Sequence, residues 1–106
     1  MKLTNKELEI MAVLWNAKVP MTAAEIVSAS SGRTWKEGSV YIFLKMLLKK
    51  KAVVLAMHKP TVSNLARAYA PTLTPEEYML ANITSVGETG VQLDIPTLIN
   101  LLKKHK

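Results

Sequence analysis

The chain has 106 residues, of which 49% are hydrophobic, and a formal net charge of +6 at pH 7. This length and apolar content exclude global disorder and predict one domain with a short appendage. The lack of cysteine excludes disulfides and thiolate chemistry and is consistent with a reducing compartment. No apolar run approaches the ~20 residues of a membrane span, and the N-terminus is unlike a signal peptide. We therefore expect a cytoplasmic protein without a membrane segment.

The positive charge is concentrated in the middle of the chain. Residues 26–75 contain eight lysines and arginines against one glutamate and carry +7, whereas residues 1–25 carry 0 and residues 76–106 carry −1. A phosphate-binding surface requires such a concentration, because each neutralised phosphate releases condensed counterions. From charge alone, an ordinary solvated basic face is an equal alternative.

Three helix starts share one capping signature, a threonine followed three residues later by a glutamate. The pairs are Thr4 with Glu7, Thr22 with Glu25, and Thr74 with Glu77. In such a capping box each side chain accepts a hydrogen bond from the other residue's backbone N–H. A helix is therefore expected to begin directly after each threonine.

In chain order, we expect a mainly α fold with a small β-hairpin. Helices are predicted over residues 5–16, 23–29 and 37–50, strands over 52–58 and 66–70, and two further helices after Thr74 and Asp94, with a loop at 85–90. Three helices followed by a two-stranded hairpin is the order of a winged helix-turn-helix, in which the third helix enters the DNA major groove and the hairpin forms the wing.

The third predicted helix has two different faces. Its core face is expected to hold Val40, Phe43, Leu44 and Leu47, with Leu48 at the margin. Its opposite face carries Gly38, Tyr41, Ile42, Lys45, Met46 and Lys49, with Ser39 at the edge. Lysine, tyrosine and serine can contact phosphates, and apolar side chains can contact thymine methyl groups. An ordinary surface helix explains the lysines at its end, through the macrodipole, but not the outward Ile42 and Met46.

Other residues support no further chemistry. Trp15 and Trp35 are expected in the core rather than as base-stacking residues. His58 and His105 lack partners at metal-ligand spacing, so we expect no metal, no cofactor and no enzyme activity.

The last helix carries an apolar stripe that either folds back on the domain or, as we favour, pairs with a second copy. The stripe consists of Ile95, Leu98, Ile99 and Leu102.

A series of ordered motifs covers about residues 3–80. They are Leu3–Trp15, Thr22–Ile26, Trp35, Ser39-Val40 with Leu44, Leu47, Lys49 and Lys50, Arg67–Pro71, and Thr74–Tyr78. Together they resemble the penicillinase-repressor family of winged-helix transcriptional regulators. The resemblance implies a repressor that binds a palindromic operator in double-stranded DNA as a homodimer. Residues 1–72 would form the winged-helix DNA-binding domain, and residues 73–106 the helical dimerisation segment. Relatives respond to a membrane sensor protease or through a cysteine-containing metal tail. Because this chain has no cysteine, the metal-tail mechanism is excluded here.

The resemblance also assigns residues to the DNA surface. By position, the family's DNA contacts fall on Ser39, Tyr41, Ile42, Lys45 and Met46, to which we add the basic residues Lys49, Lys59 and Arg67. For the dimer contact we add Tyr78 to the apolar stripe of the last helix.

The sequence departs from the family pattern at four places. Ile42 and Met46 stand where relatives carry threonine and arginine, Lys51 stands where a glycine closes the helix, and the wing lacks its usual glycine. The alternative is a winged-helix protein-interaction module with weak or no sequence-specific DNA binding.

Overall fold

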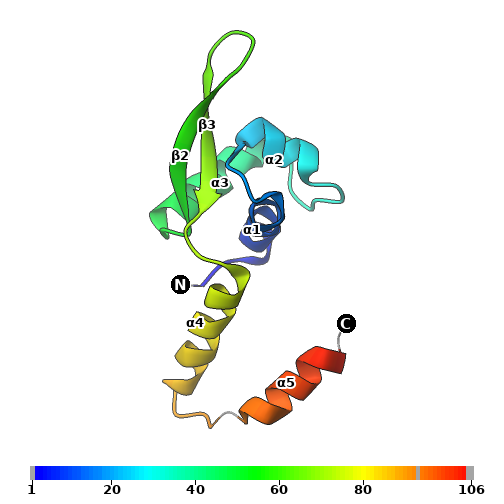
Figure 1. Ribbon diagram of the computed structural model, residues 1–106, viewed down its shortest axis with the longest axis vertical. Helices are drawn as coiled ribbons and strands as arrows, with labels where there is room; N and C mark the ends of the chain where they lie inside the picture. The colour runs from blue at the N-terminus through cyan, green and yellow to red at the C-terminus, as the bar shows by residue number, and fades with distance from the viewer. Residues whose placement is uncertain (1, 93, 105–106) are drawn as a thin grey trace.

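The computed structural model describes residues 2–92 and 94–104 (Figure 1). The chain begins with α1 (Asn5–Ala17), α2 (Ala23–Ala29) and α3 (Val40–Lys49), and a 3₁₀ turn, η1 (Glu37–Ser39), precedes α3. The capping boxes of α1, α2 and α4 (Pro75–Gly87) are all formed, with both reciprocal hydrogen bonds present in each. The three predicted helix starts are therefore confirmed. The third helix is predicted correctly except for its first turn, which is 3₁₀ rather than α.

The sheet contains one strand more than the sequence predicts. The hairpin of β2 (Val53–Pro60) and β3 (Leu65–Pro71) is antiparallel, as expected. A short strand, β1 (Met21–Thr22), pairs with the other edge of β3, which gives the order β1-β3-β2. The predicted hairpin is confirmed, and the additional strand was not predicted, because a two-residue strand has no periodicity to detect. Because β1 leads directly into α2, it joins the start of that helix to the hairpin.

The core lies between the first three helices and the sheet. On α3, the side chains of Val40, Leu44 and Leu47 are 2% exposed or less, which confirms the predicted core face, while Phe43 is half-buried. Trp35 is 5% exposed and meets the ring of Phe43 edge-on, at 6.2 Å between centroids. Trp15 packs half-buried against the core, and its Nε1–H donates to the Leu73 carbonyl at 2.8 Å. Both tryptophans therefore have the predicted structural roles.

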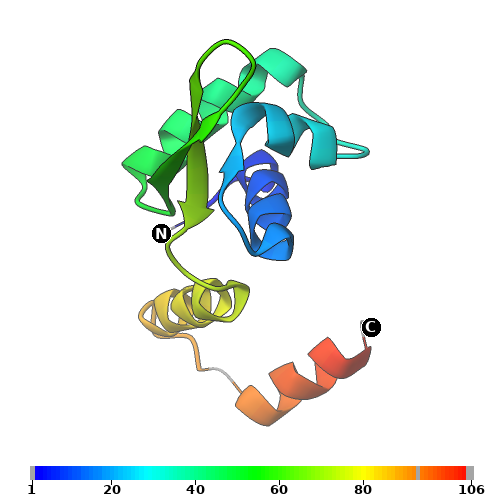
Figure 2. The ribbon, with the colours of Figure 1, turned by 45° about the horizontal axis from the view of Figure 1, so that its top comes forward.

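The C-terminal helices extend the molecule. Its principal extents are 54 × 27 × 23 Å, and both ribbon views place α5 (Ile95–Lys104) at the end opposite the hairpin loop (Figures 1 and 2). α4 continues to Gly87, so the loop predicted over 85–90 is wrong in its first three residues. The Asp94 carboxylate accepts hydrogen bonds from the backbone and hydroxyl of Thr97 at the start of α5, as expected for a cap. Nowhere in the described residues is there a helix with the length and apolar character that a membrane crossing requires.

Candidate nucleic-acid interface

The outward face of α3 carries a stripe of four side chains at positions i, i+3, i+4 and i+7. They are Ile42, Lys45, Met46 and Lys49. Ile42 is 63% exposed and Met46 is 39% exposed, and both lysines are exposed. These spacings bring the four side chains to one face, because each residue turns the helix by about 100°. The stripe therefore offers apolar contact and positive charge on the same narrow surface, and the structure brings together four of the residues predicted from the sequence.

A groove lies beside this stripe, between the start of α2 and the hairpin. Tyr41 from α3 and Arg67 from β3 both line it, together with Asn64 at the end of the hairpin loop. Tyr41 is 66% exposed and Arg67 is exposed, so a phenol hydroxyl, a guanidinium and an amide are all accessible there. Each of these groups can donate a hydrogen bond to a phosphate oxygen. The structure thus joins two further predicted residues into one surface, and adds Asn64, which is not among the predicted site residues.

Lys59 differs from the other predicted basic contacts because it is paired within the chain. Its Nζ lies 3.1 Å from Oε1 of Glu25, the glutamate of the α2 capping box. Hydrogen bonds from the Thr22 backbone and from Lys59 hold the pKa of Glu25 below its ordinary value. The pair ties the hairpin to α2, so Lys59 contributes to the placement of the wing before any ligand is bound. Sequence reasoning missed this pairing, since the partners are 34 residues apart.

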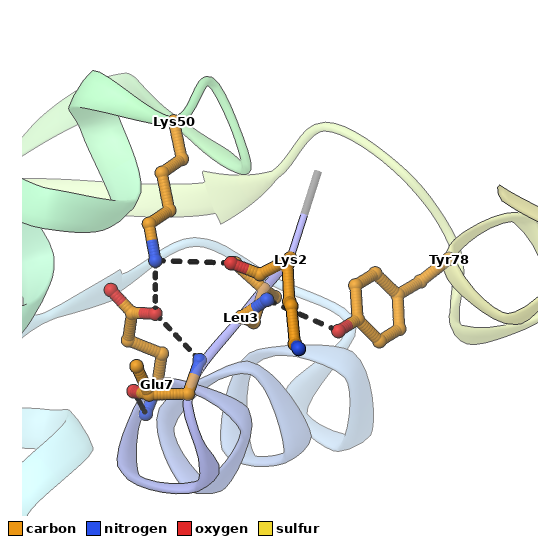
Figure 3. A network of polar contacts seen from close by, with 6 residues as sticks. Lys2, Leu3, Glu7, Lys50 and Tyr78 are labelled. Atoms are coloured by element: carbon orange, nitrogen blue, oxygen red, sulfur yellow. Dashed lines mark hydrogen bonds and ion pairs between the residues drawn. The ribbon is translucent and has the colours of Figure 1, made fainter. Parts of the chain in front are cut away.

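Lys50 is also paired within the chain, whereas its neighbour Lys49 is exposed. Its Nζ lies 2.6 Å from Oε1 of Glu7 and donates to the Lys2 carbonyl at 3.1 Å (Figure 3). Burial raises the pKa of Glu7, but the hydrogen bonds from Lys50 and Thr4 outweigh it and bring the pKa below its ordinary value. This network fixes the C-terminal end of α3 to the start of α1. The outward stripe of α3 is therefore held in a defined orientation by Lys50, which does not belong to it.

Two backbone features correspond to the departures from the family pattern. Lys51, which follows the C-cap residue of α3, has a φ of 63°, which is in the left-handed region where glycine is favoured. In the hairpin turn, the Thr61 hydroxyl donates to the Asn64 carbonyl at 2.8 Å and accepts from the Asn64 N–H at 3.1 Å. None of the described residues 61–64 has a positive φ. The turn is therefore closed by side-chain hydrogen bonds, and it has no position that requires a glycine.

Ser39 has a weaker position than expected. It lies in η1, its side chain makes no capping hydrogen bond, and it is half-buried at the edge of the α3 face. Ser39 is close in sequence to the other predicted DNA contacts, but it is less exposed than Tyr41.

The predicted dimer residues fall into two groups. On α5, Ile95, Ile99 and Leu102 are 45–47% exposed and Leu98 is half-buried. Tyr78, in contrast, is 7% exposed, and its hydroxyl accepts a hydrogen bond from the Leu3 N–H at 3.2 Å (Figure 3). Its ring centroid lies 6.2 Å from that of Trp15. Tyr78 thus attaches α4 to the first helix and has little surface left for a second copy.

Sequence reasoning missed an apolar surface on α4. Met79 and Leu80, which follow Tyr78, are 46% and 64% exposed. The available signal was that three consecutive large side chains on one helix cannot all face the same core. These two residues extend the accessible apolar surface of the C-terminal segment beyond α5.

The described residues offer no cluster of three or more histidine, aspartate or glutamate side chains that could hold a metal ion. Of the two histidines considered as ligands, His58 is an exposed residue of β2, and His105 lies outside the described residues.

Comparison with known families gives a match to the penicillinase repressors that spans residues 3–106. Comparison with curated proteins gives no match. The family match extends past the residues that carry the sequence resemblance and includes both C-terminal helices. The helix order and the three-stranded antiparallel sheet are consistent with the winged-helix fold that the resemblance implies. The chain belongs to the penicillinase repressor family.

Proposed function

We propose that the chain is a cytoplasmic transcriptional repressor that binds a palindromic DNA operator as a homodimer, with α3 in the major groove. The observation that carries this proposal is the outward stripe of α3, on which Lys45 and Lys49 flank Met46 one turn apart. A major groove about 12 Å wide admits an α-helix, and lysines on its outer face can contact phosphates or guanine edges. Tyr41 and Arg67, which line the neighbouring groove, would contact the adjacent phosphates.

The C-terminal segment supports the homodimer. Four large apolar side chains of α5 are exposed, namely Ile95, Ile99, Leu101 and Leu102, and no described residue of this ten-residue helix is buried. A helix this short is marginal alone in water, so it needs a surface to cover its apolar face. We propose that a second copy supplies that surface. Residues 1–72 would then be the DNA-binding domain and residues 73–106 the dimerisation segment. Two-fold symmetry of the protein would be matched by a palindromic operator.

The test is DNA binding as a function of salt. The full chain is titrated by fluorescence anisotropy against a randomised 30-base-pair duplex pool at several salt concentrations. Each phosphate neutralised should contribute about −0.9 to the slope of log affinity against log salt. Replacing both Lys45 and Lys49 with alanine should weaken binding and flatten the slope by roughly two such steps. Replacing both Lys103 and Lys104, on α5, provides the matched control and should leave binding unchanged.

Failure to bind any duplex at low salt would overturn the proposal. Retained DNA affinity in the variant lacking Lys45 and Lys49 would show that α3 is not the DNA-binding element. An upstream sensor protease is proposed on the family resemblance alone, and a gene for a membrane protease beside that of the repressor is the observation that tests it.

A further inference from the structure

Two apolar side chains on the outward stripe of α3 remain exposed in the folded chain. Ile42 is 63% exposed and Met46 is 39% exposed, although the core face of the same helix is almost fully buried. They are four residues apart and thus one above the other on the helix surface. Covering this apolar surface would remove it from water and would therefore favour binding. On the proposed function, the occupant of this face is the floor of the DNA major groove.

The major groove presents one apolar group to such side chains. Each base pair exposes hydrogen-bond donors and acceptors at its edge, and only thymine adds a methyl group, at C5. The isoleucine side chain has no hydrogen-bonding group and the methionine sulfur is only a weak acceptor, so neither can read the polar edges well. The chemistry that matches both is the thymine methyl.

We infer that Ile42 and Met46 determine operator specificity by contacting the 5-methyl groups of thymines. This inference rests on the proposed function. Four residues advance the helix by about 6 Å, and base pairs are stacked about 3.4 Å apart, so the two side chains reach thymines within about two base steps of each other. Lys45 and Lys49 belong to the same stripe and, on the proposed function, bind the phosphates that flank these steps. The two lysines would thus provide affinity for the DNA backbone, and the two apolar side chains would provide sequence specificity.

The experiment removes the methyl groups and nothing else. A duplex is first recovered by repeated selection of a randomised 30-base-pair pool on the wild-type chain. Each thymine of that duplex is then replaced in turn by deoxyuridine, which lacks the C5 methyl. At the contacted positions the affinity should fall about four-fold for each methyl removed, the value expected for one buried methyl-sized group. Thymines outside the contacted steps should give no change.

Variants assign the effect to the two side chains. Ile42→Ala and Met46→Ala should each lose sensitivity to deoxyuridine at their own position, so the protein and DNA changes are not additive. Leu48→Ala is the matched control: Leu48 is 38% exposed on the same helix, about 120° around it from Ile42 and about 160° from Met46, and should keep the full deoxyuridine effect. Circular dichroism melting checks that the three variants fold alike.

The outcomes separate this inference from the proposed function. Equal affinity for the thymine and deoxyuridine duplexes would overturn the inference while leaving the repressor proposal intact. An undiminished deoxyuridine effect in both Ile42→Ala and Met46→Ala would also overturn it, because other residues would then read the methyl groups. Failure of the selection to recover any duplex would overturn both.

Discussion

Replacing Lys50 with methionine tests whether the network at the end of α3 stabilises the fold. Lys50 Nζ lies 2.6 Å from the Glu7 carboxylate, whose side chain is 3% exposed. The substitution keeps most of the aliphatic stem and removes the ammonium group. Glu7 retains its hydrogen bond from the Thr4 N–H at 2.8 Å but loses the positive charge that compensates its burial. The carboxylate is thus left as a buried charge without its cation.

The expected loss is about 2 kcal/mol in the free energy of unfolding. Hydrogen bonds to charged groups contribute about 1.5–3 kcal/mol, and breaking a fully buried ion pair costs about 3–5 kcal/mol. The Lys50 side chain is 28% exposed, so solvent screens the pair and the lower range applies. For a chain of this size the melting temperature should fall by about 10 °C.

Urea unfolding followed by circular dichroism at pH 7 measures this loss, with Lys49→Met as the matched control. Lys49 is exposed and directly adjacent, and its substitution should stay within about 0.5 kcal/mol. Because the pKa of Glu7 is lowered in the folded state, the ion pair contributes stability above the unfolded pKa, and this is lost as pH falls through the folded pKa. The penalty in Lys50→Met should therefore shrink as the pH is lowered below about 4. Equal losses in the two variants, or a penalty that grows in acid, would refute the reasoning.

Three further predictions concern the backbone and the C-terminal segment. Lys51→Gly should raise the free energy of unfolding by up to about 1 kcal/mol, because the φ of 63° at this position is costly for a residue with a side chain. The urea midpoint should rise at unchanged m-value, and a lower midpoint would contradict this. Tyr78→Phe should cost about 1 kcal/mol by leaving the buried Leu3 N–H without an acceptor, yet leave the oligomeric state unchanged. Ile99→Glu, on the exposed face of α5, should halve the mass measured by sedimentation from that of a dimer to 11.7 kDa; a persistent dimer would move the interface elsewhere.

Local signals predicted most of the fold. Each capping box requires only two side chains three residues apart, so Thr4 and Glu7 specify a helix start without reference to the rest of the chain. The buried face of α3 likewise followed from the helical period, which is a property of consecutive residues. Strand β1 could not be predicted this way, because Met21 pairs with Tyr69, and only the folded hairpin brings the two together.

The candidate site was less predictable than the fold, because side-chain partners are distant in the chain. Lys49 and Lys50 are adjacent lysines that look alike in sequence, but one faces outward and the other pairs with Glu7. Tyr78 looked like an interface residue because nothing local shows that the Leu3 N–H reaches its hydroxyl. Lys59 looked free for the same reason. In each case, tertiary contacts decide which side chains remain available.

The internal pairing of Lys50 and Lys59 has a consequence for how fast the protein finds its target. Residues 26–75 contain eight basic residues, and two of these already face a carboxylate, Glu7 or Glu25, from outside that segment. At distances beyond a Debye length of roughly 8–10 Å each such pair is nearly neutral, so the far field of this segment arises from the other six basic residues and Glu37. Electrostatic acceleration of the encounter with DNA should therefore be weaker than the charge of this segment implies. A variant such as Glu25→Gln, which leaves Lys59 uncompensated, should associate faster at low ionic strength.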